Sequence, residues 1–181
     1  MPDSATIAER TARVGGERIA QFRSDGLGLS PSAYARLLAE IAETRSIAAD
    51  DYSRDGVVAE LERRMAALLG KEAAIFLPTG TLANHLAMRR LAQRGRRILV
   101  QHESHLWNDE GDCAQHLSGL TLIPLASGRA TFTLAEVEQA VEGAPEMRVA
   151  VPIGAISIET PVRRVAGEAF DPAEKIGRAH V

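Results

Sequence analysis

Short apolar runs that alternate with helical segments constrain the fold of this chain most. The runs over 73–77, 97–100 and 121–125 do not alternate in polarity, which is typical of strands buried on both faces of a parallel sheet. A further strand is predicted at 155–159, within the apolar stretch 148–159. Because helical patterns separate the runs, we expect an α/β fold, a three-layer sandwich around a mostly parallel sheet that is incomplete at the C-terminus.

Five segments have the spacing of amphipathic helices. Ser30, followed by proline, is a predicted N-cap of the first helix, and Gly70 is a predicted C-cap of the second. Thr133, with Glu136 three residues later, is typical of the start of a helix. The third helix is expected to close at Gly95. The five helices are predicted at 31–44, 57–69, 81–93, 105–117 and from 134 to about 142.

The length of 181 residues and the composition indicate an ordinary globular protein with one core. The net charge is −3 and no block of like charge is present, so neither nucleic acid nor a membrane surface is an expected partner. Cys113 is the single cysteine, which excludes an internal disulfide. The N-terminus carries no apolar stretch of the length of a signal peptide or a membrane span, so a cytoplasmic location and a small ligand are expected.

The expected domain organisation is an N-terminal segment over 1–56, with one helix, and a partial large domain over 57–174. The last six residues read IGRAHV and match, codon for codon, one frame of a common sequencing adapter. Lys175, encoded as AAG, would supply the two preceding bases of the adapter. We therefore expect 175–181 to be a non-native tail and the chain to be the N-terminal part of a longer protein.

The stretch FLPTGTLAN, at 76–84, places a glycine-containing turn between a predicted strand and the first turn of a helix. Free N–H groups and the positive end of the helix dipole favour an anion at such a place. Gly80 lets a ligand approach the backbone, and the hydroxyls of Thr79 and Thr81 can add hydrogen bonds to phosphate oxygens. The alternative is that one threonine merely caps the helix. The motifs typical of nucleoside triphosphates and dinucleotides are absent.

A second polar cluster follows the strand predicted at 97–100 and reads QHESHLWNDEGDC. The loops that follow parallel strands meet at one edge of a sheet, so we expect this cluster to face the turn at Gly80. His105 is a candidate base, metal ligand or flat surface for an aromatic ligand, and the alternative is a loop histidine that binds water. His102 has the same alternatives.

A metal site is the less favoured alternative for the same cluster. Its ligand-type side chains are His102, His105, Asp109, Cys113 and His116. The histidines of HESH are three residues apart, whereas the zincin motif H-E-x-x-H spaces them by four, and no paired cysteines accompany them. Cys113 has acidic neighbours, which favours an inert thiol over a nucleophile.

Four stretches together carry a resemblance to a known family: RSD at 23–25, VAELERRMAALLGKEAAIFLPTGTLANHLA at 58–87, ESHLWNDEGDCAQHLSG at 103–119 and ISIETPVRR at 156–164. They resemble the threonine aldolase and β-eliminating lyase group of pyridoxal phosphate enzymes, in order along the chain from about Phe22 to Asp171. The resemblance implies the fold-type I architecture, with a large α/β domain, a smaller C-terminal domain and active sites between subunits. It therefore implies a homodimer or a homotetramer.

The resemblance assigns roles to individual residues. Gly80 and Thr81 match the turn that binds the phosphate of the cofactor. His105 matches the histidine that stacks on the pyridine ring, and is the expected catalytic residue. Ser24 matches a serine that helps to hold the carboxylate of the substrate. No metal is implied.

Other positions match the family without a firm role, or depart from it. Glu110 and Glu159 align with family glutamates, so both are expected near the active site. Threonine aldolases read L-E-N-T-H-N where this chain reads IETPVR at 158–163, so the histidine that would contact the β-hydroxyl of threonine is missing. The linker around Tyr52 is one residue shorter than in the family, which leaves the match of this tyrosine open.

The resulting interpretation is a pyridoxal 5′-phosphate-dependent lyase that acts on a β-hydroxy or β-substituted amino acid, by carbon–carbon cleavage or by β-elimination. The family implies a lysine that forms a Schiff base with the cofactor and an aspartate on its pyridine nitrogen, both on later strands. The two lysines of this chain, Lys71 and Lys175, match neither role, so the chain by itself is expected to be inactive. The alternatives are a non-catalytic module that binds a phosphate ligand or cofactor and, less favoured, a metal-dependent hydrolase using His102, His105 and Asp109.

Overall fold

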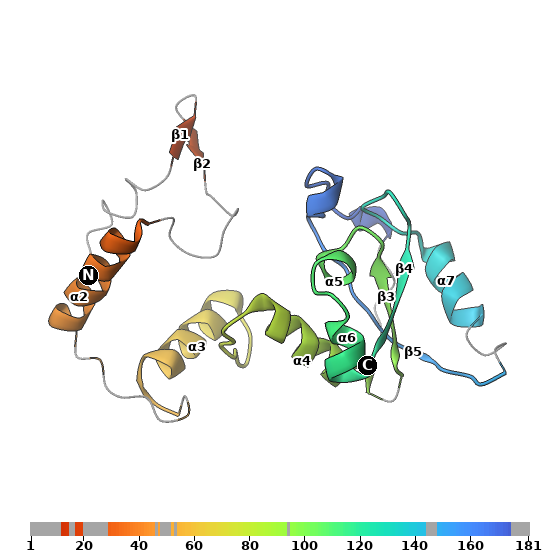
Figure 1. The fold of residues 1–181 in the computed structure, drawn as a ribbon, viewed down its shortest axis with the longest axis horizontal. Helices are drawn as coiled ribbons and strands as arrows, with labels where there is room; N and C mark the ends of the chain where they lie inside the picture. The colour runs from red at the N-terminus through yellow and green to blue at the C-terminus, as the bar shows by residue number, and fades with distance from the viewer. Residues whose placement is uncertain are drawn as a thin grey trace. The chain divides into compact units, whose positions relative to one another are not determined.

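The computed structural model describes residues 12–14, 17–19, 29–45, 47, 52, 54–93, 95–143 and 148–174. The chain forms two compact units, Met1–Phe76 and Leu77–Val181, and Figure 1 shows the order of their elements. We predicted the domain boundary after residue 56, and the domain division of the whole protein stays a prediction. Ser24 and the predicted tail lie outside the described residues.

The described residues of the first unit form a two-stranded antiparallel pair, β1 (Ala12–Val14) and β2 (Glu17–Ile19), and two helices. Helix α2 (Pro31–Thr44) begins where predicted, because the Ser30 hydroxyl accepts a hydrogen bond from the backbone N–H of the third following residue at 3.3 Å. Helix α3 (Gly56–Leu69) ends at Gly70, whose φ of 60° is the left-handed conformation that glycine adopts without strain. Both predicted helices are confirmed.

The prediction of a strand at 73–77 is wrong. These residues form no strand, and the side chains of Ile75 and Phe76 are 74% and 50% exposed. The backbone N–H of Phe76 donates instead to a side chain, the carboxylate of Glu62, at 2.8 Å. An apolar run becomes a strand only when a second strand pairs with its N–H and C=O groups, and no described segment does so here.

The second unit contains a three-stranded parallel sheet in the order β4-β3-β5. Strand β3 (Arg97–Gln101) lies in the centre, β4 (Thr121–Leu125) pairs with it along its whole length, and β5 (Ile153–Ile156) pairs on the other side with a shift of register after Arg97. The prediction of a mostly parallel sheet is confirmed. Strand β5 begins and ends earlier than the predicted 155–159.

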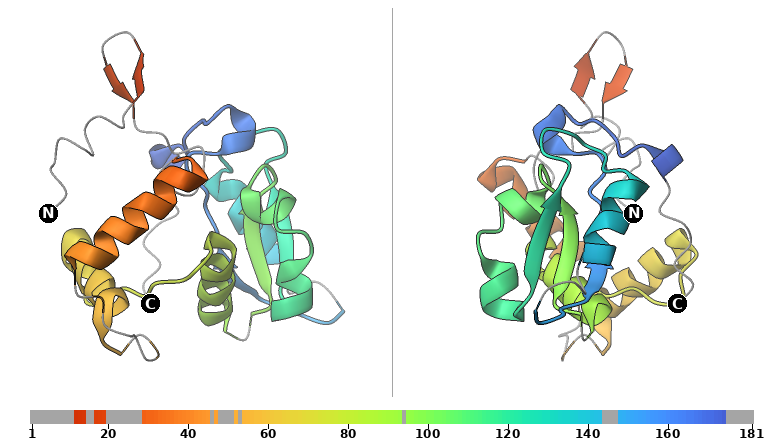
Figure 2. Two further views of the ribbon diagram at one scale, coloured as in Figure 1. Left: turned by 60° about the vertical axis from the view of Figure 1, so that its left-hand side comes forward. Right: turned by 90° about the vertical axis from the view of Figure 1, so that its right-hand side faces the viewer.

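The helices of the second unit lie on both faces of this sheet. Helices α4 (Gly80–Ala92), α5 (His105–Asn108) and α6 (Cys113–Ser118) pack on one face, and α7 (Leu134–Gly143) packs on the other. The right-hand view of Figure 2 shows the sheet between α6 and α7. The described part of the chain then ends with two 3-10 turns, η1 (Arg163–Val165) and η2 (Pro172–Glu174). The predicted three-layer α/β arrangement is therefore present.

The side chains of β3 divide between two apolar cores. Ile98 and Val100 pack against α4, α5 and α6, whereas Leu99 packs against α7 and Phe132. The three β3 side chains and that of Phe132 are completely buried. Successive residues of a strand point to opposite faces, and both faces of β3 are covered, so a run of apolar residues without alternation is what this strand requires.

Two predicted helices differ in detail from the structure. The helix predicted at 105–117 is split into α5 and α6, because Gly111 adopts a φ of 57° that interrupts the helical backbone. The helix predicted to close at Gly95 ends at Ala92, with Gln93 as its C-cap. Gly95 serves a different purpose, because a Cβ built on it would lie 2.5 Å from the Cα of Gly154 in β5. Glycine at both positions allows the loop before β3 to approach β5.

Candidate functional site

The N-terminus of α4 leaves backbone donors available at Gly80 and Thr81. Thr79 is the N-cap, as its hydroxyl accepts a hydrogen bond from the N–H of Leu82 at 3.1 Å. The capping alternative is thus correct for Thr79. No described residue accepts a hydrogen bond from the N–H of Gly80 or of Thr81. A Cβ built on Gly80 would meet no atom within 4 Å, so the backbone at this helix start is open to a ligand.

The turn at Gly80 and His105 lie at the same edge of the sheet. The C-terminal end of α4 leads into the start of β3. The N-terminal end of α4 therefore lies near the other end of β3, where the loop to α5 begins. Contacts of Glu110 demonstrate the proximity. The Glu110 carboxylate accepts a hydrogen bond from Asn84, one turn into α4, at 3.1 Å, and lies 3.5 Å from the His105 ring. The structure therefore brings the two predicted regions together.

The backbone of His105 is fixed at the start of α5. Ser104 is the N-cap, and its hydroxyl accepts from the N–H of Trp107 at 3.3 Å. The N–H of His105 donates to the Glu159 carboxylate. On the other side of the turn, the Asn108 amide donates to the carbonyl oxygens of His102 and Ser104 at 2.7 and 2.9 Å. These contacts leave the His105 backbone little freedom to move.

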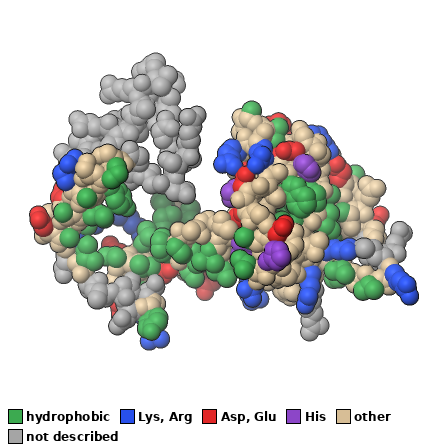
Figure 3. Space-filling model, in the orientation of Figure 1, with side chains coloured by type: hydrophobic (Ala, Val, Ile, Leu, Met, Phe, Trp, Pro, Cys, Tyr) green, Lys and Arg blue, Asp and Glu red, His purple; other side chains and the backbone are tan. Residues whose placement is uncertain are grey.

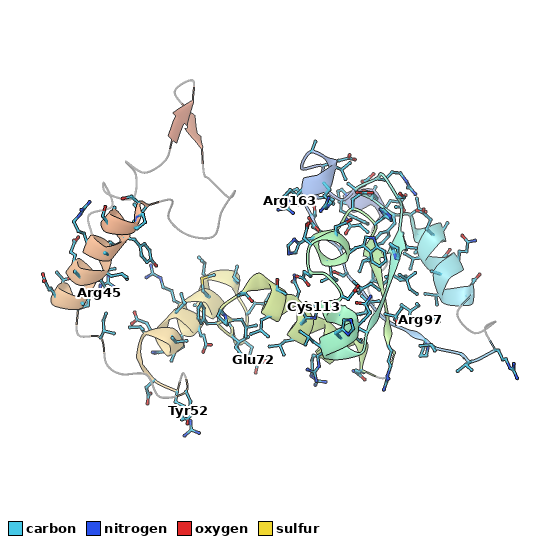
Figure 4. The ribbon with its side chains drawn as sticks, in the orientation of Figure 1. Arg45, Tyr52, Glu72, Arg97, Cys113 and Arg163 are labelled. Carbon is cyan, nitrogen blue, oxygen red and sulfur yellow. The ribbon has the colours of Figure 1, made fainter. Side chains whose placement is uncertain are left out.

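The ring of His105 has a carboxylate beside each nitrogen. Nδ1 is hydrogen-bonded to Oδ2 of Asp109 at 3.1 Å, and Nε2 lies 3.5 Å from Oε1 of Glu110. Asp109 is itself held by Arg163 and Arg164 at 2.6 and 2.5 Å, and Arg163 is labelled in Figure 4. The hydrogen bond from Arg164 holds the pKa of the Asp109 carboxyl below its ordinary value. A carboxylate thus lies beside each nitrogen, with a hydrogen bond at Nδ1, while the side chain stays half-exposed.

Glu159 reaches His105 because a buried amide holds its backbone. Gln101, at the end of β3, is completely buried. Its amide nitrogen donates to the carbonyl oxygens of Glu159 and Ala130 at 2.8 and 2.7 Å, and its amide oxygen accepts from the N–H of Glu159 at 2.7 Å. The expectation that Glu159 lies near the site agrees with this position. Gln101 was not predicted as a site residue, because a polar residue at a strand end does not show in the sequence which way it points.

A cavity of about 260 Å³ adjoins His105, between α4, α5 and the segment that follows β5. Its polar lining comes from Asn84, Ser104, His105, Ser157 and Glu159, and the remaining lining is mostly apolar. Such a combination of an apolar wall and a few convergent polar groups is typical of small-molecule sites. Gly80 and Thr81 do not line this cavity.

Sequence reasoning missed a buried pair of ionisable groups beside the site. His85 of α4 and Glu110 are 5% and 7% exposed, and His85 Nε2 lies 3.3 Å from Glu110 Oε2. A signal was available, because His85 is three residues before Met88 and seven before Ala92, both of which face the core. A histidine on the apolar stripe of a helix is expected to be buried.

The described residues do not support the metal alternative. They contain no group of three or more His, Cys, Asp or Glu side chains able to hold a metal ion. His102 is hydrogen-bonded to Glu103 at 2.8 Å, and Glu103 also accepts from the N–H of Gly128, which lowers the pKa of its carboxyl. His116 is exposed on α6. Among the residues proposed as ligands, His102 is therefore hydrogen-bonded to Glu103, and His105 and Asp109 form a pair without a third ligand.

Two further expectations concern Ser24 and Tyr52, which belong to the first unit. Ser24 lies outside the described residues, so its predicted contact with a substrate stays a prediction. Tyr52 is 91% exposed, and its match to the family tyrosine stays open. Within the described part of the chain, no helix is both long and apolar enough to cross a membrane.

Comparison with known proteins gives consistent matches. The model of the β-eliminating lyase family matches residues 22–176. A low specificity L-threonine aldolase of Escherichia coli is 33% identical over 109 residues, which is 60% of this chain and 33% of that protein. The alanine racemase TOXG of Cochliobolus carbonum is 32% identical over 116 residues, which is 64% of this chain and 29% of the racemase.

A solved structure has the same fold. The crystal structure of a Listeria monocytogenes protein assigned as an L-allo-threonine aldolase matches with a TM-score of 0.65 and 27% identity, over 81% of this chain and 39% of that one. The chain thus spans about a third of the length of the relatives it matches. The family model covers most of the chain, and the fold of the solved relative agrees with it. The chain belongs to the β-eliminating lyase family.

Proposed function

We propose that the full-length protein is a pyridoxal 5′-phosphate-dependent lyase that acts on a β-hydroxy or β-substituted amino acid. The observation that carries the proposal is the position of an open helix start, at Gly80 and Thr81, at the same sheet edge as the His105 ring, which has a carboxylate beside each nitrogen. A phosphate group and an aromatic ring are the two parts of this cofactor that a protein must recognise. The family membership of the chain supports the same assignment.

The start of α4 has the chemistry needed for the phosphate. The N–H groups of Gly80 and Thr81 would donate to phosphate oxygens, the Thr81 hydroxyl would add a further hydrogen bond, and the positive end of the helix dipole favours the charge. The absence of a Cβ at Gly80 keeps the approach open. These groups bind and orient, and no proton transfer is required of them.

The bound cofactor would supply the chemistry, because its ring takes up the electrons released when a bond at the α or β carbon of the substrate breaks. The task of His105 would be to present a flat face to that ring. Asp109 and Glu110 lie beside its two nitrogens, so the edge of the imidazole is engaged and a face remains for stacking. This geometry favours stacking over a role as a general base.

The remaining parts of the proposal concern the substrate and the assembly. Ser24 is proposed to bind the carboxylate of the amino acid, and the protein is proposed to act as a homodimer or homotetramer. The relatives include an aldolase and a racemase, so the chemical outcome must be measured. Aldol cleavage would yield glycine and an aldehyde, and β-elimination would yield a keto acid and a leaving group.

Absorbance of the full-length protein tests the proposal. Added pyridoxal phosphate should give a visible band that shifts when a β-hydroxy amino acid is supplied, and product analysis should identify one of the two cleavages. The same protein with Gly80→Val should bind the cofactor more weakly, because a branched side chain would occupy the space for the phosphate. Failure to bind pyridoxal phosphate would contradict the proposal. Binding without turnover of any amino acid would instead support the non-catalytic module.

Substitution of His105 tests its role. If the ring stacks, His105→Phe should retain most of the cofactor affinity, whereas His105→Ala should lose about 2- to 12-fold, the range expected for an aromatic contact. A general base would contribute roughly 10²–10⁴-fold to the rate, and phenylalanine could not replace it. His116→Ala, at an exposed position of α6, is the control. Equal and severe losses of turnover for the Phe and Ala variants would reject stacking as the main role.

A further inference from the structure

A histidine interrupts the apolar stripe by which α4 packs on the sheet. The buried residues of α4 are His85, Met88 and Ala92, and the last two belong to the apolar core over β3. Packing alone favours an apolar side chain at such a position. The ring faces Glu110, with 3.3 Å between His85 Nε2 and Glu110 Oε2. Burial alone therefore does not explain why a histidine occupies position 85.

The Glu110 carboxylate depends on His85 for compensation. A carboxylate that is 7% exposed is costly unless hydrogen bonds or an opposite charge accompany it. Oε1 of Glu110 accepts from the Asn84 amide at 3.1 Å. Oε2 is buried and has no hydrogen-bond partner among the described residues, and neither ring nitrogen of His85 has one. The two side chains face each other at ion-pair distance. Removal of either side chain would leave the other buried without its partner.

The two oxygens of Glu110 connect His85 to His105. Oε1, which accepts from Asn84, also lies 3.5 Å from Nε2 of His105. A carboxylate is planar and rigid, so the position that His85 imposes on one oxygen fixes the other. His85 itself does not line the cavity beside His105. Its influence on the site would therefore pass through Glu110.

We propose that His85 is a positioning residue, which holds Glu110 in place and through it sets the orientation of the His105 ring. The consequence for the cofactor rests on the proposed function, because it assumes that His105 stacks on the pyridine ring. The link from His85 to His105 stands apart from that function, since all three side chains belong to this chain.

The first experiment uses the full-length protein without cofactor, so it does not depend on the proposed function. The NMR resonances of the His105 ring would be compared in His85→Leu, His85→Gln and an exposed control, His116→Gln. Leucine fills the space without a polar group, whereas glutamine can donate a hydrogen bond to Glu110. We expect the His105 resonances to shift strongly with leucine, weakly with glutamine and not in the control. Unchanged His105 resonances in a folded His85→Leu variant would overturn the proposal.

A double substitution guards against loss of folding. His85→Leu leaves a buried carboxylate without its partner, but His85→Leu combined with Glu110→Gln does not. If His85 acts through Glu110, the double variant should show the same His105 resonances as Glu110→Gln alone. The effect of the double substitution on the equilibrium constant of unfolding should differ from the product of the two single effects by more than about twofold. This is the lower end of the range expected for residues in contact. Additive effects on both measurements would overturn the proposal.

The second experiment adds pyridoxal phosphate and measures the circular dichroism of its visible band, which depends on the tilt of the bound ring. His85→Leu should reduce this signal and weaken binding by about 2- to 12-fold, as expected for a misplaced aromatic contact, and His85→Gln should restore most of both. A protein that binds no pyridoxal phosphate would contradict the proposed function alone, because the cofactor-free experiment would still decide the link. Normal dichroism in His85→Leu would overturn the positioning role.

Discussion

The helices of the first unit and the sheet of the second unit are held together in different ways. Helix α2 buries none of its side chains, and in α3 only Ala66 is buried. In β3, by contrast, Ile98, Leu99 and Val100 are completely buried. Figure 3 shows apolar side chains exposed along α2 and α3. A helix satisfies its backbone hydrogen bonds within its own segment, whereas a strand forms only with a partner.

The comparison teaches which substitutions matter. In the sheet region, each buried side chain contacts several elements, so its loss removes packing that nothing replaces. In α2 and α3, the described side chains are mostly exposed, and the helices depend on caps and local spacing. We therefore expect core substitutions to be costly in the second unit and mild in the first.

The largest difference is expected between Phe132→Ala and Leu38→Ala. Phe132 is completely buried and packs edge-to-face on Phe170 with ring centroids 5.1 Å apart, whereas Leu38 of α2 is half-exposed. The first substitution should lower the free energy of unfolding by about 3–5 kcal/mol. The second should change it by no more than about 0.5 kcal/mol. Urea unfolding, followed by the fluorescence of the single tryptophan, Trp107, and by far-UV circular dichroism, measures both. Equal losses would contradict the comparison.

A smaller difference is expected between two glycines of the second unit. A Cβ at Gly154 would lie 2.5 Å from the carbonyl oxygen of Ala92 and closer still to that of Gly95, whereas a Cβ at Gly143 would meet nothing within 4 Å. Gly154→Ala must push backbone apart and should cost about 1–3 kcal/mol. Gly143→Ala, at the end of α7, is the matched control and should be close to neutral. Thermal unfolding of both variants would show whether β5 is packed as tightly as β3.

The smallest effect concerns pH. The pKa of Asp109 is lower in the folded protein than in the unfolded chain, chiefly because of the hydrogen bond from Arg164. Its contribution to stability is therefore complete above the unfolded pKa of about 4 and is lost as the pH falls through the lowered folded value. Solvent access to these side chains keeps the effect small. The Trp107-monitored urea midpoint should fall less between pH 6 and 3 in Asp109→Asn than in the unsubstituted protein. An identical pH dependence in both would contradict the assigned cause.

Most helices and two strands of the fold could be predicted from local signals. Ser30 and Gly70 mark helix ends by chemistry that acts within a few residues, and Thr133 pairs with Glu136 as predicted, with the Thr133 N–H donating at 2.8 Å. The run at 73–77 has the composition of a strand but depends on a distant partner, which sequence composition does not reveal. The break at Gly111 also escaped prediction, because glycine occurs within helices as well as at their ends.

For the candidate site, the rule that parallel strands end at one sheet edge predicted that Gly80 and His105 would meet. The buried pair of His85 and Glu110 beside the site was not predicted. His85 and Glu110 are 25 positions apart in the numbering, and their contact depends on the angle at which α4 packs on the sheet. The position of Gln101 was equally hidden, since its partners at Ala130 and Glu159 lie far along the chain.

The Gln101 amide limits which residues evolution can place at the end of β3. Its side chain must offer a donor and an acceptor at the same reach, because it bonds both the N–H and the C=O of Glu159. A charged glutamate lacks the donor, leucine lacks both groups, and asparagine is shorter by one methylene. Leu99, two residues earlier, only has to fill apolar space and can be exchanged for other aliphatic side chains. Position 101 therefore tolerates far fewer substitutions than position 99, although Gln101 and Leu99 are equally buried.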